Sequence, residues 1–295
     1  MAQQSTINAV RAGGARSAGS KAALEPWFAR FPLPDEHGHK HDRGRVLVLA
    51  GRRHETGAAR LAAAAALRVG AGLVTLVAAS DAADVCAMHA TAVMVLVADG
   101  PDEWEETIGE RDATAVALGM GLAPSAATRD AVDAALRSGA AVVLDAGALT
   151  AFREAPDELF ERIGERGAPT VLTPHAGEFQ RLFGRVDPAE AAERSGATVL
   201  LKGSTTFVAD PHGWTGRSSD GPRWLATAGT GDVLAGMVAG LLGQGMDGHD
   251  AASAAVWLHS EVARRVGPGL IAEDLVPAMR PVLAEVLEAR LATSG

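Results

Sequence analysis

The residues with the clearest chemical character lie around position 230, where a run of small side chains comes just before a predicted helix. Positions 226–236 read Ala-Thr-Ala-Gly-Thr-Gly-Asp-Val-Leu-Ala-Gly. Glycine allows a tight turn, and a helix N-terminus presents unpaired N–H groups with a partial positive charge. Gly229, Thr230 and Gly231 are therefore expected to form a nest of main-chain donors for a phosphate or a similar anion.

Asp232 places a carboxylate at the same helix start, where its charge opposes that of a bound anion. The residues alone leave two roles open for it. As an N-cap, Asp232 would do no more than accept hydrogen bonds from the first helical N–H groups. As a general base, it would take the proton of a hydroxyl group while that hydroxyl attacks phosphorus.

An α/β architecture is expected to position these residues. Short apolar runs alternate with Ala-, Glu- and Arg-rich stretches of helical length, which predicts βαβ units and a mostly parallel sheet with helices on both faces. Ligands of such sheets bind beyond the carboxyl ends of the strands. Strands are predicted over residues 45–50, 73–78, 92–97, 114–118, 141–145, 170–173 and 198–202, with a hairpin partner at 206–209.

Three predicted helices close the chain, over about 232–242, 249–265 and 273–292, with a kink or a break near Pro281. The glycine-rich stretch 243–248 formally matches a dinucleotide fingerprint. It lies between two helices and does not follow a strand, so we interpret it as a helix C-cap and connecting loop.

Composition narrows the function classes further. The chain has 295 residues, a hydrophobic fraction of 47% and a net charge of −9, so nucleic acid is not an expected partner. No apolar run reaches the roughly 18 residues of a membrane helix, and a cytoplasmic location is expected. Residues 1–24 are poor in large apolar groups and predict a disordered leader, with a transit peptide as the alternative. Residues 25–295 are expected to form a single domain.

A family resemblance appears in the segment 225–236. The sequence of this segment resembles the glycine–aspartate signature of ribokinase-like small-molecule kinases, and more narrowly that of the ADP-dependent NAD(P)H-hydrate dehydratases. Further motifs occur in the order of that family over about residues 25–290. They lie at 39–45, 56–60, 70–75, 119–122, 144–146, 173–178 and 201–206. The resemblance implies a ribokinase-like catalytic domain.

The activity implied by this resemblance is that of a hydro-lyase in nicotinamide nucleotide repair. It would use ADP to dehydrate (6S)-hydrated NADH or NADPH back to NADH or NADPH, releasing AMP and phosphate. Mg²⁺ is the implied cofactor, although no acidic cluster in the sequence predicts its ligands. Two alternatives stay open, a kinase of the hydroxyethylthiazole or hydroxymethylpyrimidine type and a non-catalytic nucleotide-binding module. The resemblance also implies a homo-oligomer, such as a homotetramer, and a separate epimerase acting on the same hydrate.

The resemblance assigns roles residue by residue. Asp232 is the implied catalytic base and also contacts the hydrate. The residues implied to bind ADP or AMP are Lys202, Gly203, Ser204, Thr205, Thr206, Gly229, Thr230 and Gly231. The residues implied to line the hydrate pocket are Ala58, Gly121, His175 and Asp232.

The residues themselves leave simpler alternatives at several of these positions. The stretch 202–206 also fits a hairpin turn with a surface lysine, which is the less favoured interpretation. Glu178 fits a helix cap or a group that orients a hydrated metal, and capping is the preferred interpretation. Asp145, at the end of a predicted strand, is compatible with two roles, lining the pocket and capping a loop. The chain also departs from the family pattern, with Gly147 at a common aspartate position and Ala176 at a common proline position.

Overall fold

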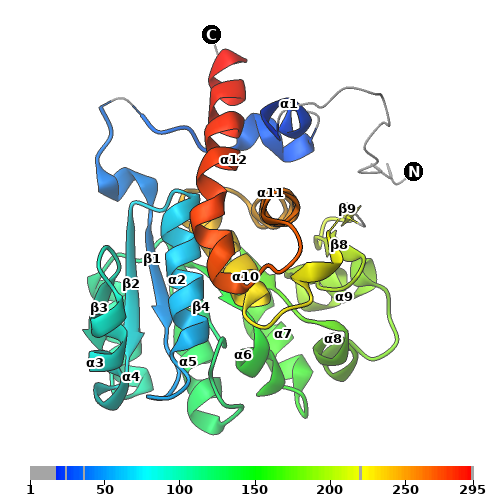
Figure 1. Ribbon diagram of the computed structural model, residues 1–295. Coiled ribbons are helices and arrows are strands. Elements are labelled where there is room, and N and C mark those ends of the chain that lie inside the picture. Colours follow the sequence, from blue (N-terminus) through cyan, green and yellow to red (C-terminus); the bar gives the residue numbers. More distant parts are fainter. Residues whose placement is uncertain (1–17, 24, 36, 219–220, 294–295) are drawn as a thin grey trace.

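The computed structural model describes residues 18–23, 25–35, 37–218 and 221–293. In these residues one sheet of nine strands forms, in the order β3-β2-β1-β4-β5-β6-β7-β8-β9 (Figure 1). The first seven strands are parallel, whereas β8 and β9 are antiparallel to their neighbours. Their bounds are β1 Arg45–Leu49, β2 Leu73–Ala78, β3 Met94–Val97, β4 Ala115–Leu118, β5 Ala141–Leu144, β6 Thr170–Leu172, β7 Thr198–Leu201, β8 Thr206–Ala209 and β9 Thr215–Ser218.

The central strands are buried on both faces, which explains their continuous apolar sequences. Every residue of β4 and β5 is buried, as expected for parallel strands covered by helices on each side. The predicted α/β fold, the seven predicted strands and the 206–209 hairpin partner are confirmed. Strand β9 is an addition, because Thr-Gly-Arg-Ser carries no apolar alternation and is ordered by pairing with β8.

Two helical layers enclose the sheet, and each forms its own core cluster with it. One layer contains α2 (Gly57–Val69), α3 (Ser80–His89), α10 (Thr230–Gly243), α11 (Gly248–Val266) and α12 (Ala272–Ala292). The other contains α4 (Pro101–Glu110), α5 (Ala126–Arg137), α6 (Ala146–Thr150), α7 (Pro156–Gly164), α8 (Ala176–Phe183) and α9 (Pro188–Ser195). The predicted coverage of both faces is therefore confirmed.

Helices α2 and α10 approach each other closely because their contact is built from small residues. A side chain at Gly236 would overlap the backbone of Ala62, and one at Gly240 would come within 2.9 Å of the Ala66 Cα. The Ala-rich face of α2 leaves room for this approach. The packing fixes where α10 begins, and it therefore fixes the position of the glycine-rich turn.

The N-terminal boundary of the fold lies earlier than expected. Helix α1 (Ala18–Ala22) packs against α12 beside the C-terminal end of that helix (Figure 1), with Ala18 and Ala22 fully buried. The Ala18 N–H donates to Glu285 Oε2 at 2.6 Å. The assignment of residues 1–24 to a disordered leader is thus wrong for 18–22, where small side chains allow close helix packing. Residues 1–17 lie outside the described residues.

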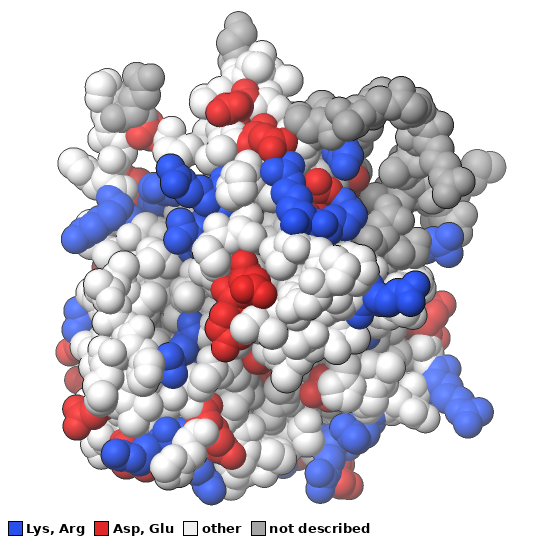
Figure 2. Space-filling model, in the orientation of Figure 1, with Lys and Arg blue, Asp and Glu red and all other residues white. Residues whose placement is uncertain are grey.

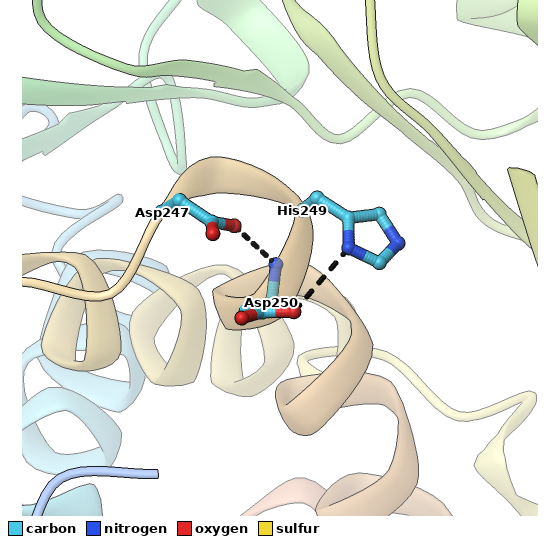
Figure 3. A group of neighbouring side chains, drawn as sticks. All are labelled: Asp247, His249 and Asp250. Carbon is cyan, nitrogen blue, oxygen red and sulfur yellow. Dashed lines mark hydrogen bonds and ion pairs between the residues drawn. The ribbon is translucent and has the colours of Figure 1, made fainter. Parts of the chain in front are cut away.

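An ion pair between an exposed arginine and a buried aspartate attaches the following segment to α11. Arg30, in the short 3₁₀ helix Pro26–Arg30, pairs with Asp250, and its Nη2 lies 2.6 Å from Asp250 Oδ1. His249 Nδ1 lies 3.4 Å from the same Asp250 oxygen, and Asp247 accepts from the Asp250 N–H at 2.7 Å (Figure 3). Burial acts to raise the pKa of Asp250, but His249 and Arg30 outweigh it and lower the pKa to about 2. The side chains of Asp247, His249 and Asp250 are therefore all engaged in structural contacts.

Helix α12 runs without a break from Ala272 to Ala292, so the break allowed for near Pro281 does not occur. Each proline removes one N–H donor from the helix. Burial of Met279 before Pro281 and of Val282 and Val286 after it holds both halves against the same core.

Two surface observations complete the description. None of the helices in the described ranges combines the length and the apolar character needed to cross a membrane. Charged groups of both signs are scattered over the face shown in Figure 2, with broad uncharged areas between them.

Candidate active site

The glycine-rich turn forms the N-terminus of α10, as the sequence predicts. Gly229 is the N-cap and has φ 87°, a left-handed conformation that favours glycine. A Cβ there would lie 2.8 Å from both Leu61 Cδ1 and Ala272 Cβ. Gly231 and Asp232 follow in the first helical turn, where N–H groups have no partner within the helix. The turn therefore presents main-chain donors at the start of a helix.

Thr230 serves the turn by fixing its shape. Its side chain is buried, and the hydroxyl lies 2.7 Å from the Leu225 carbonyl and 2.9 Å from the Thr227 carbonyl. The single hydroxyl proton is shared between these two backbone oxygens. This shared hydrogen bond holds residues 225–230 in a compact loop. A ligand would meet the main chain of this turn more readily than the Thr230 hydroxyl.

Asp232 is the third residue of α10, and Gly229 occupies the cap position without any side-chain cap bond. The N-cap role considered for Asp232 is therefore wrong. Its side chain is partly buried, and this burial, together with the charge of Asp145, raises its pKa to about 6, while Lys202 acts in the opposite direction. A carboxyl with a pKa near neutrality suits proton transfer.

Lys202 connects the glycine turn to Asp145. Its Nζ lies 2.7 Å from Asp145 Oδ1, with side-chain exposures of 20% and 2% respectively. The same ammonium lies 3.4 Å from the point that a Gly231 Cβ would occupy. Lys202 is therefore a half-buried cation placed against the nest, and the surface-lysine alternative is wrong.

Asp145 also performs the loop-capping role considered for it. It directly follows β5 and accepts from the Ala146 N–H at 2.9 Å as the N-cap of α6. Ala146 has φ 44°, a strained value for a residue with a side chain. Gly147 cannot take the aspartate common in the family without a shift, because a Cβ would overlap the Leu122 carbonyl.

His175 and Glu178 form a reciprocal cap at the start of α8. His175 Nδ1 accepts from the Gly177 N–H at 2.9 Å, and Glu178 Oε2 accepts from the His175 N–H at 2.9 Å. The preferred capping interpretation of Glu178 is confirmed. His175 remains more than half exposed and forms an isolated parallel bridge with Lys202.

Ala58 and Gly121 lie side by side at the start of α2. A Cβ on Gly121 would be 3.6 Å from Ala58 Cβ, and Gly121 has φ 73°. Leu61, one helical turn after Ala58, is the residue that contacts Gly229. Two of the four residues assigned to the hydrate pocket are thus next to each other, with Ala58 on the helix that abuts the glycine turn and Gly121 in the loop beside it.

A cavity of about 550 Å³ opens beside the nest. Lys202, Gly203, Ser204 and Thr206 line one side, and Thr230 and Gly231 form the turn. Thr205 and Gly229, although assigned to the same group, are not among the lining residues, and neither are Ala58, Gly121 and Asp232 of the hydrate pocket. The structure therefore brings most of the predicted nucleotide residues to one cavity, and His175 lies at its edge.

The cavity also has walls that the sequence did not identify. They consist of the end of β9, the segment around the short 3₁₀ helix Arg223–Leu225, one residue of α10 and one face of α11. Their residues are Ser218, Gly221, Pro222, Arg223, Leu225, Ala226, Leu234, Val256, His259 and Ser260. His259 and Ser260 lie within α11, where no local motif distinguishes them. Only the packing of α11 against α10 turns them toward the cavity.

Comparison with known proteins identifies the class. A family model described as NAD(P)H-hydrate dehydratase matches residues 46–283, and the chain belongs to this family. A crystal structure of the ADP/ATP-dependent NAD(P)H-hydrate dehydratase of Bacillus subtilis, co-crystallized with ATP and Mg²⁺, superimposes with a TM-score of 0.75 and 30% identity. The alignment covers 88% of this chain and 96% of the Bacillus chain. The ribokinase-like fold is thereby confirmed.

Two further relatives are similar over most of this chain. The ADP-dependent (S)-NAD(P)H-hydrate dehydratase of Xanthomonas campestris is 36% identical over 277 residues, which cover 85% of this chain and 92% of that protein. The bifunctional NAD(P)H-hydrate repair enzyme Nnr of Moorella thermoacetica is 37% identical over 286 residues. That match covers 88% of this chain but only 53% of the Moorella protein. The chain therefore spans about half the length of this bifunctional relative.

Proposed function

We propose that this protein dehydrates (6S)-hydrated NADH and NADPH at the expense of ADP, releasing AMP and phosphate. The observation that carries the proposal is that Lys202 and Gly231 line one cavity, while the next residue, Asp232, is partly buried and has a pKa that responds to the charges of Asp145 and Lys202. Family membership favours this reaction over the phosphorylation catalysed by hydroxyethylthiazole-type kinases.

The first step assigns each of these groups a task. The nucleotide phosphates bind the main-chain donors of the Gly229–Gly231 turn, with the Lys202 ammonium beside them. The C6 hydroxyl of the hydrated nicotinamide attacks the terminal phosphorus of ADP, and AMP leaves. Asp232 accepts the hydroxyl proton. With a pKa of about 6, most Asp232 side chains are ionised at pH 7 and able to act as a base.

The second step needs little from the protein. The ring nitrogen lone pair expels phosphate from C6, and loss of a proton from C5 restores the dihydronicotinamide. The sum of both steps is hydrate plus ADP giving dinucleotide plus AMP, phosphate and one proton, so atoms and charges balance. The protein's contribution is to exclude water from the phosphoryl group and to align the hydroxyl with it.

A magnesium ion fits the site only when it is bound together with the nucleotide phosphates. The group of three potential ligand side chains found among the described residues is Asp247, His249 and Asp250, which belongs to the α11 anchor. Near the nest, Asp145 and Asp232 are the carboxylates able to contribute, and Mg²⁺ commonly takes one or two carboxylates with phosphate oxygens and water. When bound, it would neutralise phosphate charge.

The remaining assignments follow from the same proposal. A protein of this activity would work with an epimerase that interconverts the hydrate epimers, supplied by another chain or domain. A homo-oligomer, such as a homotetramer, and a cytoplasmic location are proposed on the family resemblance alone.

The proposal is tested with the purified protein, (6S)-hydrated NADH, ADP and Mg²⁺. Recovery of the NADH absorbance with one AMP formed per NADH is expected. Failure of both signals would contradict the proposal, and a stable phosphorylated product detected by mass spectrometry with ATP would favour the kinase alternative.

A further inference from the structure

A second cavity, of about 440 Å³, opens near the β3 edge of the sheet, between α2, α12 and the loop that joins α3 to β3 (Figure 1). We call it the edge cavity. Its lining residues are Arg60, Ala64, Leu67, Arg68, Leu76, His89, Ala90, Thr91, Ala92, Val93 and Val276. It shares no described lining residue with the nucleotide cavity, so it is separate from the site of the proposed reaction.

Helix α2 presents one stripe of side chains to the edge cavity. Its four lining residues are Arg60, Ala64, Leu67 and Arg68, and spacings of four, seven and eight residues place them on the same side of a helix. The backbone of a helix is enclosed by its own side chains, so the two arginine side chains themselves form part of the wall. They are eight residues apart, about 12 Å along the helix axis, and both are long enough to reach a ligand placed between them.

The wall of the edge cavity is positively charged. Neither an aspartate nor a glutamate is among its described lining residues, although the chain has 36 of them. Arg60 and Arg68 form no ion pair with a carboxylate of the described residues, whereas Arg162 pairs with Asp133. A cationic hollow in a chain of net charge −9 attracts small anions.

The loop between α3 and β3 adds main-chain donors to this wall. Within the described ranges, no backbone hydrogen bond is donated by the N–H groups of Thr91, Ala92 or Val93. Guanidinium groups and unpaired main-chain N–H groups are the donors with which proteins bind phosphate. The edge cavity therefore combines both kinds of phosphate donor.

The remaining wall is apolar. Leu67 of α2, Leu76 of β2 and Val276 of α12 line it. Sites for small organic ligands are typically built in this way, with mostly apolar walls and a few polar groups that fix the orientation of the ligand. An inorganic anion would leave this part of the wall without a partner.

We propose that the edge cavity binds a small organic phosphate ester. The phosphate contacts Arg60 and Arg68 and the N–H groups of the 91–93 loop, and the apolar body of the ligand lies against Leu67 and Val276. This site is independent of the proposed function, because none of its residues belongs to the nucleotide cavity or the hydrate pocket.

The test is calorimetric titration with phenyl phosphate of the wild type, Arg60→Gln, Arg68→Gln and Arg111→Gln. Arg111 is the control, an exposed arginine at the C-terminal end of α4 that does not line the edge cavity. Arg60→Gln and Arg68→Gln should each bind phenyl phosphate about 10-fold more weakly, the loss of one charge-assisted contact, whereas Arg111→Gln should match the wild type. The nucleotide cavity is the same in all four proteins, so binding there cancels in the comparison.

Two further measurements sharpen the result. Wild-type protein should bind phenyl phosphate more tightly than inorganic phosphate, because only the ester contacts the apolar wall; equal affinities would overturn the assignment of an organic phosphate. The unfolding temperatures of Arg60→Gln and Arg68→Gln should stay close to that of the wild type, since neither arginine pairs with a carboxylate.

Unchanged phenyl phosphate affinity in both cavity variants would overturn the inference. If their affinity is unchanged and their oligomeric state in analytical ultracentrifugation differs from that of the wild type, the edge cavity belongs to a contact between copies of the chain, and the inference is overturned in the same way. Neither result would bear on ADP-dependent turnover, which tests the proposed function separately.

Discussion

Replacing Asp145 by asparagine tests whether Asp232 is the base whose ionisation controls the reaction. Asp145 is one of two causes that raise the pKa of Asp232 from 3.8 to about 6, and burial is the larger of the two. Removing the Asp145 charge while keeping its shape should lower the pKa of Asp232 by roughly half a unit to one unit, which is modest for the loss of a nearby like charge.

The direction of the pH effect follows from the role of a base. Asp232 works when ionised, so activity falls as pH drops through its pKa. In Asp145→Asn the acid limb of kcat/KM for ADP should therefore move to lower pH than in the wild type. The titration of ADP itself is common to both proteins and cancels in the comparison.

The assay is the rate of NADH recovery between about pH 5 and pH 8, which spans the ordinary range around a pKa of about 6. Asp145→Asn also weakens the anchor of Lys202, so KM for ADP is expected to rise. An acid limb that stays in place, or moves to higher pH, would refute the assignment of Asp232 as the titrating base.

Two further predictions concern the scaffold. Gly236→Ala should cost about 1–3 kcal/mol of unfolding free energy and reduce turnover, because the new Cβ meets the Ala62 backbone and displaces α10; Gly109→Ala on α4, with open space around it, should be neutral or stabilising. Urea denaturation checks both, and equal effects would contradict the close packing of α2 and α10. Arg30→Ala should cost about 1.5–3 kcal/mol near pH 7 through the loss of charge-assisted bonds to Asp250. The pKa of Asp250 is lowered from 3.8 to about 2, so this stabilisation is present above about pH 4 and is lost as pH falls toward 2. If the destabilisation caused by Arg30→Ala stays the same as pH falls from about 4 toward 2, the assigned role of the Arg30–Asp250 ion pair is contradicted.

Local patterns in the sequence were sufficient to predict most of the fold. Buried parallel strands have continuous apolar sequences, so eight strands were recognisable from their residues alone. Strand β9 was not, because its order depends on pairing with β8 and not on its own composition. Helix α1 was missed for a similar reason, because its alanines become buried only through contact with α12.

The site was predictable where its residues are adjacent in the chain. The 226–236 turn carries its own signature, and its role as a helix start was confirmed. The pairing of Lys202 with Asp145 joins residues 57 positions apart. It arises because β5 and β7 flank β6, which places the ends of these strands at one edge of the sheet. His259 depends on helix packing and had no local signal.

The measurement that bears most directly on the account is the kinetics of Asp232→Asn, with Asp102→Asn as the control. Asp102 also lies in the first turn of a helix, but it is exposed and on the opposite face of the sheet. Asp232→Asn should lose about 10²-fold or more in kcat while its Kd for ADP stays within a few-fold of the wild type. Asp102→Asn should match the wild type in both. An Asp232→Asn protein that keeps its turnover, or that loses only ADP affinity, would contradict the role of Asp232 as the base beside the phosphate nest.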